Sequence, residues 1–244
     1  MRKSKNILFV FEGQKSEPLA FTSLQRFFLN EGERTIIHAV FCGEIYSLYH
    51  VLKKDEDLEL FYILKDKEAN KESLADLSLK DISEVYLFFD HDAHATAADE
   101  VKLRAMLEFF NEETENGKLY ISYPMVEAIK HFHPDHCFKS LTVEIGKNKQ
   151  YKAFVANNCC NQYKNIQAYS KGQWFTLIKN NLMKASYIVS GNYELPEHLI
   201  PQSQIFSCQQ EKYIKTRNEV SVLSSIPLFL KEYYGVEKLL DYLP

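Results

Sequence analysis

The chain has 244 residues, 45% of them hydrophobic and 25% charged, with a formal net charge of −4, which is an ordinary globular composition. It excludes collagen-like and disordered chains, and no apolar run reaches the roughly 18 residues that a membrane-spanning helix needs. Residues 1–6 lack the pattern of a signal peptide and the five cysteines lack the spacing of a disulfide framework, so we expect a cytoplasmic protein with reduced thiols and no membrane partner.

Strands and helices are expected to alternate over the first part of the chain. Continuous apolar runs predict strands at residues 6–11, 35–41, 58–64, 84–89 and 119–122. Helical patterns predict helices at residues 17–28, 44–54, 99–111 and 125–133. Such alternation is typical of a Rossmann-like α/β fold with a mostly parallel sheet flanked by helices, and we place this core at residues 1–135.

The rest of the chain is expected to leave this core and return to it. Residues 136–205 predict an inserted, mainly helical lobe, and residues 206–244 predict a C-terminal segment that returns to the core. Residues 221–234 are strongly apolar, which predicts a helix. Exposed apolar side chains on that helix would favour a homodimer.

Charge is unevenly placed along the chain. Residues 145–193 contain no Asp or Glu, yet they hold seven of the 29 basic residues and many aromatic and amide side chains. Cations follow phosphates and aromatic faces stack on bases, so this stretch predicts contact with DNA or RNA. A helical lobe with an aromatic core and a solvated lysine face would show the same pattern, and both interpretations stay open. The residues expected to contact nucleic acid here are Lys147, Lys149, Tyr151, Lys152, Lys164 and Trp174.

Two of the expected strands end in acidic residues. Glu12 and Gly13 follow the first strand, and Asp90 and Asp92 stand at alternate positions after a later one. The carboxyl ends of parallel strands form the ligand-binding edge of such a sheet, and close carboxylates repel one another unless a cation lies between them. Mg²⁺ and Mn²⁺ prefer oxygen ligands, so we expect one of these ions here. Further candidate ligands stand near strand ends, at Glu17 and Glu127.

The sequence around these acids resembles that of TOPRIM domains. Residues 6–17 read Asn-Ile-Leu-Phe-Val-Phe-Glu-Gly-Gln-Lys-Ser-Glu and look like the opening strand of that domain with its Glu and Gly. Residues 86–92 read Tyr-Leu-Phe-Phe-Asp-His-Asp and look like its Asp-x-Asp motif. The resemblance extends to residues 120–133 and 219–235 but not to the lobe, and it is closer to the stand-alone RloB/AriB-type TOPRIM proteins of bacterial anti-phage systems.

This resemblance implies a metal-dependent nuclease that hydrolyses phosphodiester bonds. The residues that it implies as catalytic and as ligands of one or two Mg²⁺ or Mn²⁺ ions are Glu12, Asp90 and Asp92, with Glu17 and Glu127 as further ligands and Lys15 as a phosphate contact. It also implies an ABC-type ATPase partner protein and a role as the toxic effector of antiviral defence by abortive infection. The family suggests host tRNA as a substrate, but no residue here chooses between RNA and DNA.

Other interpretations of the same residues stay open. Asp90 and Asp92 also suit the nucleophile and the acid/base of a haloacid-dehalogenase-like phosphatase. Against it, His94 stands where that family has Thr or Val, and Glu12 would be unexplained. A TOPRIM-like module that only binds nucleic acid or a partner is a second alternative, and polar strand ends without chemistry are a third.

A group of histidines has the composition of a zinc site. Its members are His131, His133, His136 and Cys137, and their spacing matches no standard zinc pattern. Pro134 interrupts the helix between them, so we expect surface histidines and leave metal binding open.

Overall fold

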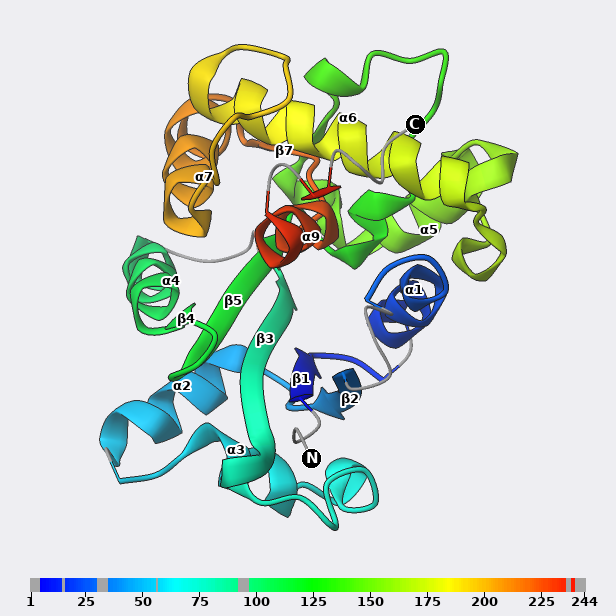
Figure 1. The fold of residues 1–244 in the computed structure, drawn as a ribbon. Helices are drawn as coiled ribbons and strands as arrows, with labels where there is room; N and C mark the ends of the chain where they lie inside the picture. Colours follow the sequence, from blue (N-terminus) through cyan, green and yellow to red (C-terminus); the bar gives the residue numbers. More distant parts are fainter. Residues whose placement is uncertain are drawn as a thin grey trace. The chain divides into compact units, whose positions relative to one another are not determined.

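The computed structural model describes residues 5–14, 16–29, 35–55, 57–91, 97–235 and 238–239 (Figure 1). The chain divides into two compact units, each made of two segments. The first unit comprises Met1–Phe89 and Ala105–Leu119, and the second comprises Asp90–Arg104 and Tyr120–Pro244. Two predicted site residues, Lys15 and Asp92, lie outside the described residues.

A five-stranded sheet with the order β2-β1-β3-β5-β4 is the framework of the first unit. Its strands are β1 (Lys5–Phe11), β2 (Thr35–Phe41), β3 (Ile82–Asp90), β4 (Asn111–Glu112) and β5 (Gly117–Ser122). β1 pairs in parallel with both β2 and β3, and β4 pairs antiparallel with β5. The predicted α/β class with a mostly parallel sheet is therefore confirmed.

The apolar run of β1 explains its central place in the sheet. Every residue from Asn6 to Phe11 is buried, as expected of a strand covered on both faces. Phe9 and Phe11 meet Phe21 of α1 (Ser16–Gln25) and Phe88 of β3, with ring centroids between 4.5 and 5.7 Å apart. Aromatic pairs contribute about 0.5–1.5 kcal/mol each beyond the area that they bury, so this cluster fixes α1 against β1 and β3.

One predicted strand of the first unit is wrong. Residues 58–64 were expected to be extended, but α3 (Leu60–Asp66) occupies most of this segment. Its buried residues Leu60, Phe61 and Leu64 share one helical face, and a short apolar run alone does not separate a helix from a strand. The helices expected nearby are confirmed, as α2 (Ile45–Lys54) and α4 (Ala97–Phe109).

The second unit is mainly helical and carries a small antiparallel sheet. The sheet pairs β6 (Thr142–Glu144) with β7 (Glu219–Ser221). The longer helices are α5 (Asn148–Asn158), α6 (Lys171–Ser190), α7 (Gln202–Gln209) and α9 (Ile226–Tyr234). A π-helical turn, Gln210–Ile214, and the short α8 (Lys215–Arg217) connect α7 to β7.

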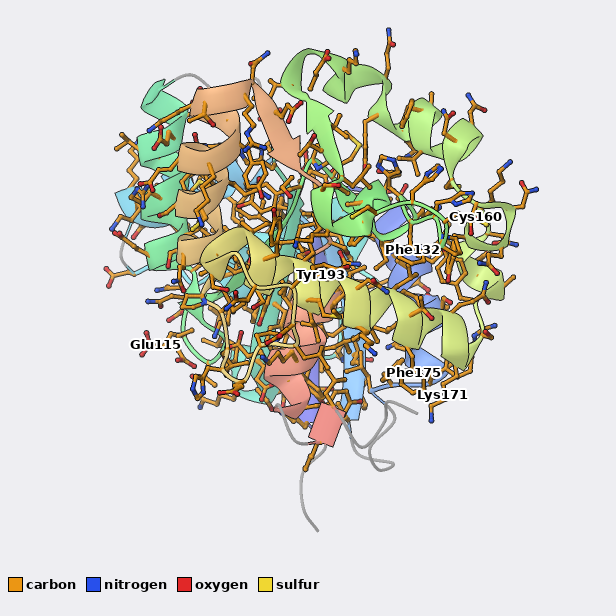
Figure 2. All side chains as sticks on the ribbon, turned by 90° about the horizontal axis from the view of Figure 1, so that it is seen from above. Glu115, Phe132, Cys160, Lys171, Phe175 and Tyr193 are labelled. Atoms are coloured by element: carbon orange, nitrogen blue, oxygen red, sulfur yellow. The ribbon has the colours of Figure 1, made fainter. Side chains whose placement is uncertain are left out.

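Helix α6, the long yellow helix of Figure 1, is the centre of this unit and packs against α7 and α9. It begins with a capping box, in which Ser170 and Gln173 satisfy each other's backbone N–H groups. It ends at Gly191, whose φ of 85° is a left-handed conformation that favours glycine. Lys171 and Phe175, labelled in Figure 2, lie near its start, with the ammonium 5.2 Å from the ring centroid.

Two helix predictions in the second unit need correction. Residues 125–133 form only a single 3₁₀ turn, Val126–Ile129, and not a full helix. Residues 221–234 divide into the end of β7 and the helix α9. The apolar residues of α9 are buried within the chain, so this helix does not present the exposed apolar surface that favoured a homodimer.

The helices of the described segments were also tested against the dimensions of a lipid bilayer. None of them is both long enough and apolar enough to cross one.

Candidate functional site

The first unit places two of the predicted acids beside one turn. Glu12 directly follows β1 and is exposed, whereas Glu17, on the first turn of α1, is only 7% exposed. The carboxylate of Glu17 lies against Gly13, because a Cβ atom added to Gly13 would stand 3.3 Å from Glu17 Oε2. The turn between β1 and α1 therefore brings Glu17 back to the residue that follows Glu12.

The buried thiol of Cys42 lies near the carboxylate of Glu12. The Cys42 N–H donates to the carbonyl of Phe11 at 3.0 Å, so Cys42 lies beside the end of β1. Burial raises the pKa of the Cys42 thiol to about 12, the nearby Lys67 opposes that shift, and the carboxylate of Glu12 adds to it. Glu12 thus contributes negative charge at the carboxyl ends of β1 and β2.

The second unit places the other two described acids around one backbone turn. Asp90, the last residue of β3, accepts a hydrogen bond on Oδ1 from the Val126 N–H at 2.8 Å. Glu127, the residue after Val126, is buried, and its Oε1 lies 3.1 Å from Lys152 Nζ. This ammonium offsets the charge of Glu127 in the folded chain, and the role of Glu127 as a metal ligand stays a prediction.

The register of the sheet relates the two acidic segments. Phe11 of β1 pairs with Phe88 of β3, so these two parallel strands end at the same edge. Glu12 follows Phe11 directly, and Asp90 follows Phe88 by two residues. Within residues 5–14, 16–29, 35–55, 57–91, 97–235 and 238–239, no three His, Cys, Asp or Glu side chains form a group that would hold a metal ion. The predicted metal set, which includes Asp92, stays a prediction.

The structure corrects two of the predicted nucleic-acid contacts. Tyr151 and Trp174 are 1% and 0% exposed, so their rings belong to the core of the lobe and offer no face to a base. The helical interpretation of the acid-free stretch explains these aromatic residues. Phe154 on α5 is different, because 48% of it is exposed.

The lysines of residues 145–193 differ in their exposure and in their ion pairs. Lys147 and Lys152 are exposed but lie in ion pairs, the first 2.9 Å from Glu144 and the second with Glu127. Lys164 is exposed after a short 3₁₀ helix, and the side chain of Lys149 lies outside the described residues. Lys184 is fully buried, which the sequence pattern did not indicate.

The members of the histidine group contact different neighbours. The rings of His133 and His136 stack with their centroids 4.3 Å apart, and Nδ1 of His133 lies 3.7 Å from Asp135. His131 shares a hydrogen bond with the hydroxyl of Tyr151 at 2.9 Å. Cys137 is exposed, and hydrogen bonds from Ser140 hold the pKa of its thiol below the usual value.

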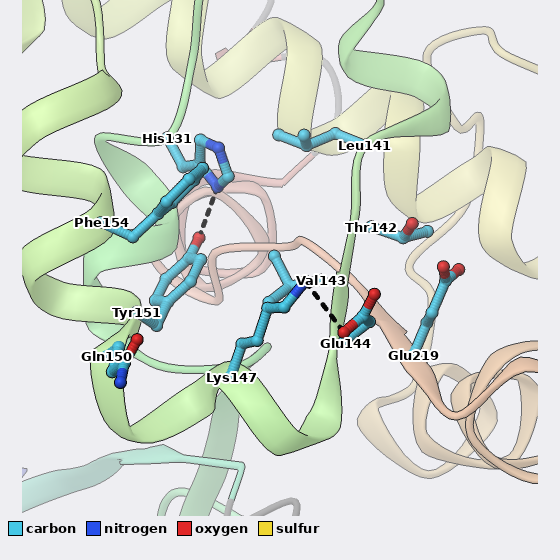
Figure 3. Close-up of a pocket in the computed structure, with 10 residues that line it drawn as sticks. All are labelled: His131, Leu141, Thr142, Val143, Glu144, Lys147, Gln150, Tyr151, Phe154 and Glu219. Carbon is cyan, nitrogen blue, oxygen red and sulfur yellow. Dashed lines mark hydrogen bonds and ion pairs between the residues drawn. The ribbon is translucent and has the colours of Figure 1, made fainter.

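A cavity of about 290 Å³ lies between α5 and β6 (Figure 3). No local sequence pattern indicated it, since its walls come from three separate segments of the chain. The lining residues are His131, Leu141, Thr142, Val143, Glu144, Lys147, Gln150, Tyr151, Phe154 and Glu219. All of them belong to the second unit.

The polar floor of this cavity is uncharged near neutral pH. Burial, together with the positive charge of Lys184, lowers the pKa of His131 to about 4. Burial and the nearby Glu127 raise the pKa of Tyr151 well above its usual value. The His131–Tyr151 pair therefore offers neutral hydrogen-bonding groups.

Comparison with known proteins adds no assignment to this geometry. No protein-family model, no curated protein and no solved structure matches the chain.

Proposed function

We propose that this chain is a Mg²⁺- or Mn²⁺-dependent nuclease of the TOPRIM type, acting on phosphodiester bonds of RNA or DNA. The observation that carries the proposal is the pairing of β1 and β3 as neighbouring parallel strands whose carboxyl ends lead into Glu12 and Asp90. Ligands of open parallel sheets bind at this edge. The sequence resemblance adds a cytoplasmic anti-phage effector, toxic to its host and controlled by an ABC-type ATPase, as the setting of that activity.

The donor atoms suit a hard divalent cation. Glu12, Glu17 and Asp90 offer carboxylate oxygens only, and Mg²⁺ and Mn²⁺ take oxygen ligands from few protein residues, with water and phosphate completing the shell. We propose that these three residues and Asp92 hold the ion. A cation bound there would supply Lewis-acid stabilisation of the charge on the scissile phosphate.

The remaining steps belong to side chains of this chain. Glu12 is exposed after β1, so solvent reaches its carboxylate, which would accept the proton of an attacking water. The Val126 N–H holds one oxygen of Asp90 and thereby orients the other. Lys164 and the other exposed lysines of residues 145–193 would bind the phosphates on either side of the cleaved bond.

Two neutral substitutions test the catalytic assignment. Glu12→Ala and Asp90→Asn are expected to lower the cleavage rate of labelled RNA or DNA with Mg²⁺ by at least about 10²-fold, because each removes a charged oxygen that the reaction needs. Asp90→Asn retains an oxygen that accepts from Val126, so the fold is preserved. Glu115→Ala and Asp76→Asn change exposed acids elsewhere and serve as matched controls.

The outcomes separate the alternatives. Equal cleavage by Glu12→Ala and the Glu115→Ala control would end the catalytic role of Glu12. Hydrolysis of small phosphomonoesters without cleavage of polynucleotides would favour the phosphatase. Tight binding of nucleic acid without cleavage in any divalent ion would favour a binding module.

A further inference from the structure

The cavity between α5 and β6 is large enough for one small ligand. Its volume of about 290 Å³ is near the lower end of the range for pockets that enclose small ligands. In Figure 3, Phe154 and Tyr151 stand on the α5 side, and Thr142, Val143 and Glu144 stand on the β6 side. A group that enters between these walls would meet the neutral His131–Tyr151 pair, which also lines the cavity.

Phe154 supplies an aromatic surface at this cavity. Its neighbours in the lobe, Tyr151 and Trp174, bury their rings completely, so its 48% exposure is an exception within the same stretch. The ring of His131 fixes it edge-on, with centroids 5.6 Å apart and planes at 74°. Stacking of a base on such a ring is worth about 1–3 kcal/mol and tolerates any base.

Two carboxylates line the same cavity and can accept hydrogen bonds from a ligand. Glu144 of β6 and Glu219 of β7 are directly opposite in the antiparallel register, where like charges destabilise a sheet. Lys147 offsets one of them by its ion pair with Glu144. Among the described residues no ion pair of Glu219 is found, so this carboxylate can accept a donor from outside the chain.

The donors that fit are amino groups of nucleobases. Cytosine, adenine and guanine carry exocyclic amines that donate to carboxylates, whereas uracil and thymine present a carbonyl oxygen at the position of the cytosine amine. A carboxylate would repel that oxygen. The cavity therefore distinguishes cytosine from uracil by charge as well as by hydrogen bonding.

The surroundings favour nucleic acid over a basic peptide. Residues 145–193, which include all of α5, hold no acid, and Lys164, Lys171 and Lys179 are exposed in this stretch. That surface attracts phosphates and repels a cationic chain, while the carboxylates inside the cavity keep phosphates out of it. A nucleotide would match this charge pattern if its base lay inside the cavity, near the carboxylates, and its phosphate lay outside, near the lysines.

We propose that this cavity is a recognition pocket for one unpaired, amino-bearing base of a single-stranded nucleic acid, with Phe154 stacking on the base and Glu219 accepting from its amine. The proposal rests on the nuclease function and names the feature of the substrate that the enzyme selects. Its residues stand apart from the proposed catalytic acids in the sequence, so substrate choice and cleavage can be separated by mutation.

The test is equilibrium binding of labelled homopolymers of about ten nucleotides, a length that one small domain contacts. Cytidine and uridine RNAs and their deoxy counterparts are compared by fluorescence anisotropy in EDTA, which prevents cleavage. Wild-type protein is expected to bind the cytidine strand at least about fivefold more tightly than the uridine strand. Glu219→Gln should reduce this ratio, while the exposed control Glu197→Gln should not.

The aromatic contact is tested in the same assay. Phe154→Ala is expected to weaken binding of both strands at least about fivefold, and Phe154→Trp should restore it. Tyr62→Ala is the matched control, because Tyr62 is 50% exposed and lies in the first unit.

Each failure has a distinct meaning. Binding of all strands with an unchanged ratio in Glu219→Gln and undiminished affinity in Phe154→Ala would overturn the pocket and leave the nuclease proposal standing. Binding of none of the strands would count against the nuclease proposal itself and remove the pocket with it. An oligolysine peptide that binds more tightly than any strand, and that Glu219→Gln weakens, would replace the base with a basic side chain.

Discussion

The buried ammonium of Lys184 is satisfied by backbone carbonyls. Its Nζ donates to the carbonyl of Phe138 at 2.9 Å and to that of Leu141 at 2.5 Å, and it lies over the ring of Phe138. Burial lowers its pKa well below the usual lysine value. This lysine holds the segment before β6 against α6, so one cation of the acid-free stretch serves the fold.

The partly buried side chain of His131 is expected to make the folded chain less stable in acid. Its pKa is lowered to about 4 in the folded chain from 6.5, so between these values the unfolded state binds a proton that the folded state refuses. The contribution of His131 is therefore fully present above pH 6.5 and declines as pH falls toward 4, by at most about 3 kcal/mol.

Urea unfolding at about pH 7.5 and about pH 4.5 measures this effect. His131→Gln, which retains a hydrogen-bonding side chain for Tyr151, is expected to lose less free energy of unfolding than wild type between the two pH values. His50→Gln changes an exposed histidine and should follow wild type. Equal losses in all three proteins would show that His131 is as readily protonated in the folded chain as in the unfolded one.

At the scale of elements, Asn70 joins a strand to a helix. Its Oδ1 accepts from the Phe41 N–H, and its Nδ2 donates to the carbonyls of Phe41 and Leu64, all at 2.8 Å. Phe41 ends β2 and Leu64 lies in α3, so one buried amide satisfies backbone groups of two elements. This explains a fully buried Asn in the first unit.

Asn70→Asp is therefore expected to destabilise the first unit by about 3–5 kcal/mol, because a buried carboxylate would face two carbonyl oxygens and lose both donations. The free energy of unfolding in urea measures this loss. Asn111→Asp makes the same change at an exposed position and is expected to stay within about 0.5 kcal/mol of wild type. A loss under about 1 kcal/mol for Asn70→Asp would mean that the amide network contributes little.

Strands and helices could be predicted from the sequence where their own apolar pattern is specific for one type of element. The strands at residues 6–11 and 35–41 were predicted correctly from their apolar runs, although only the first of them is buried. The strand predicted at residues 58–64 was wrong because Leu60, Phe61 and Leu64 also fit one face of a helix. Only the packing of the unit decides between a helix and a strand here. The β6–β7 pair could not be predicted from the sequence, because a strand of three residues is too short to show an alternating hydrophobic pattern.

At the scale of the molecule, the lysines divide into those that hold carboxylates and those that do not. Lys147 and Lys152 have acidic partners, whereas no such pair of Lys164 or Lys179 is found among the described residues. Only a cation that is not already compensated releases a full counterion when it meets a phosphate. The proposed nucleic-acid surface therefore contains fewer lysines than residues 145–193 hold.

The salt dependence of binding checks this division. Lys164→Ala with Lys179→Ala is expected to lower the slope of log affinity against log salt by about 0.7–0.9 for each phosphate that the protein no longer neutralises. Lys147→Ala with Lys152→Ala should lower it less, because those ammonium groups already have counter-charges. The opposite order would show that the ion pairs open when nucleic acid binds.

The proposed catalytic acids could be identified from the sequence, whereas the proposed base pocket could not. Glu12 and Asp90 were found because each follows a recognisable strand, and the pairing of β1 with β3 agrees with the edge expected for them. The pocket joins residues around positions 131, 142–154 and 219, so only the folded chain brings its walls together. Tyr151 and Trp174 were misplaced because aromatic residues between lysines suit a core as well as a surface.

The close approach of Gly13 to the carboxylate of Glu17 limits how this chain can diverge. A side chain at position 13 would require the carboxylate of residue 17 to shift by a few tenths of an ångström, so we expect substitutions at the two positions to influence each other. Relatives that keep a carboxylate at the second position should keep the smallest residue at the first, and a mutational scan of both positions together should show the same dependence.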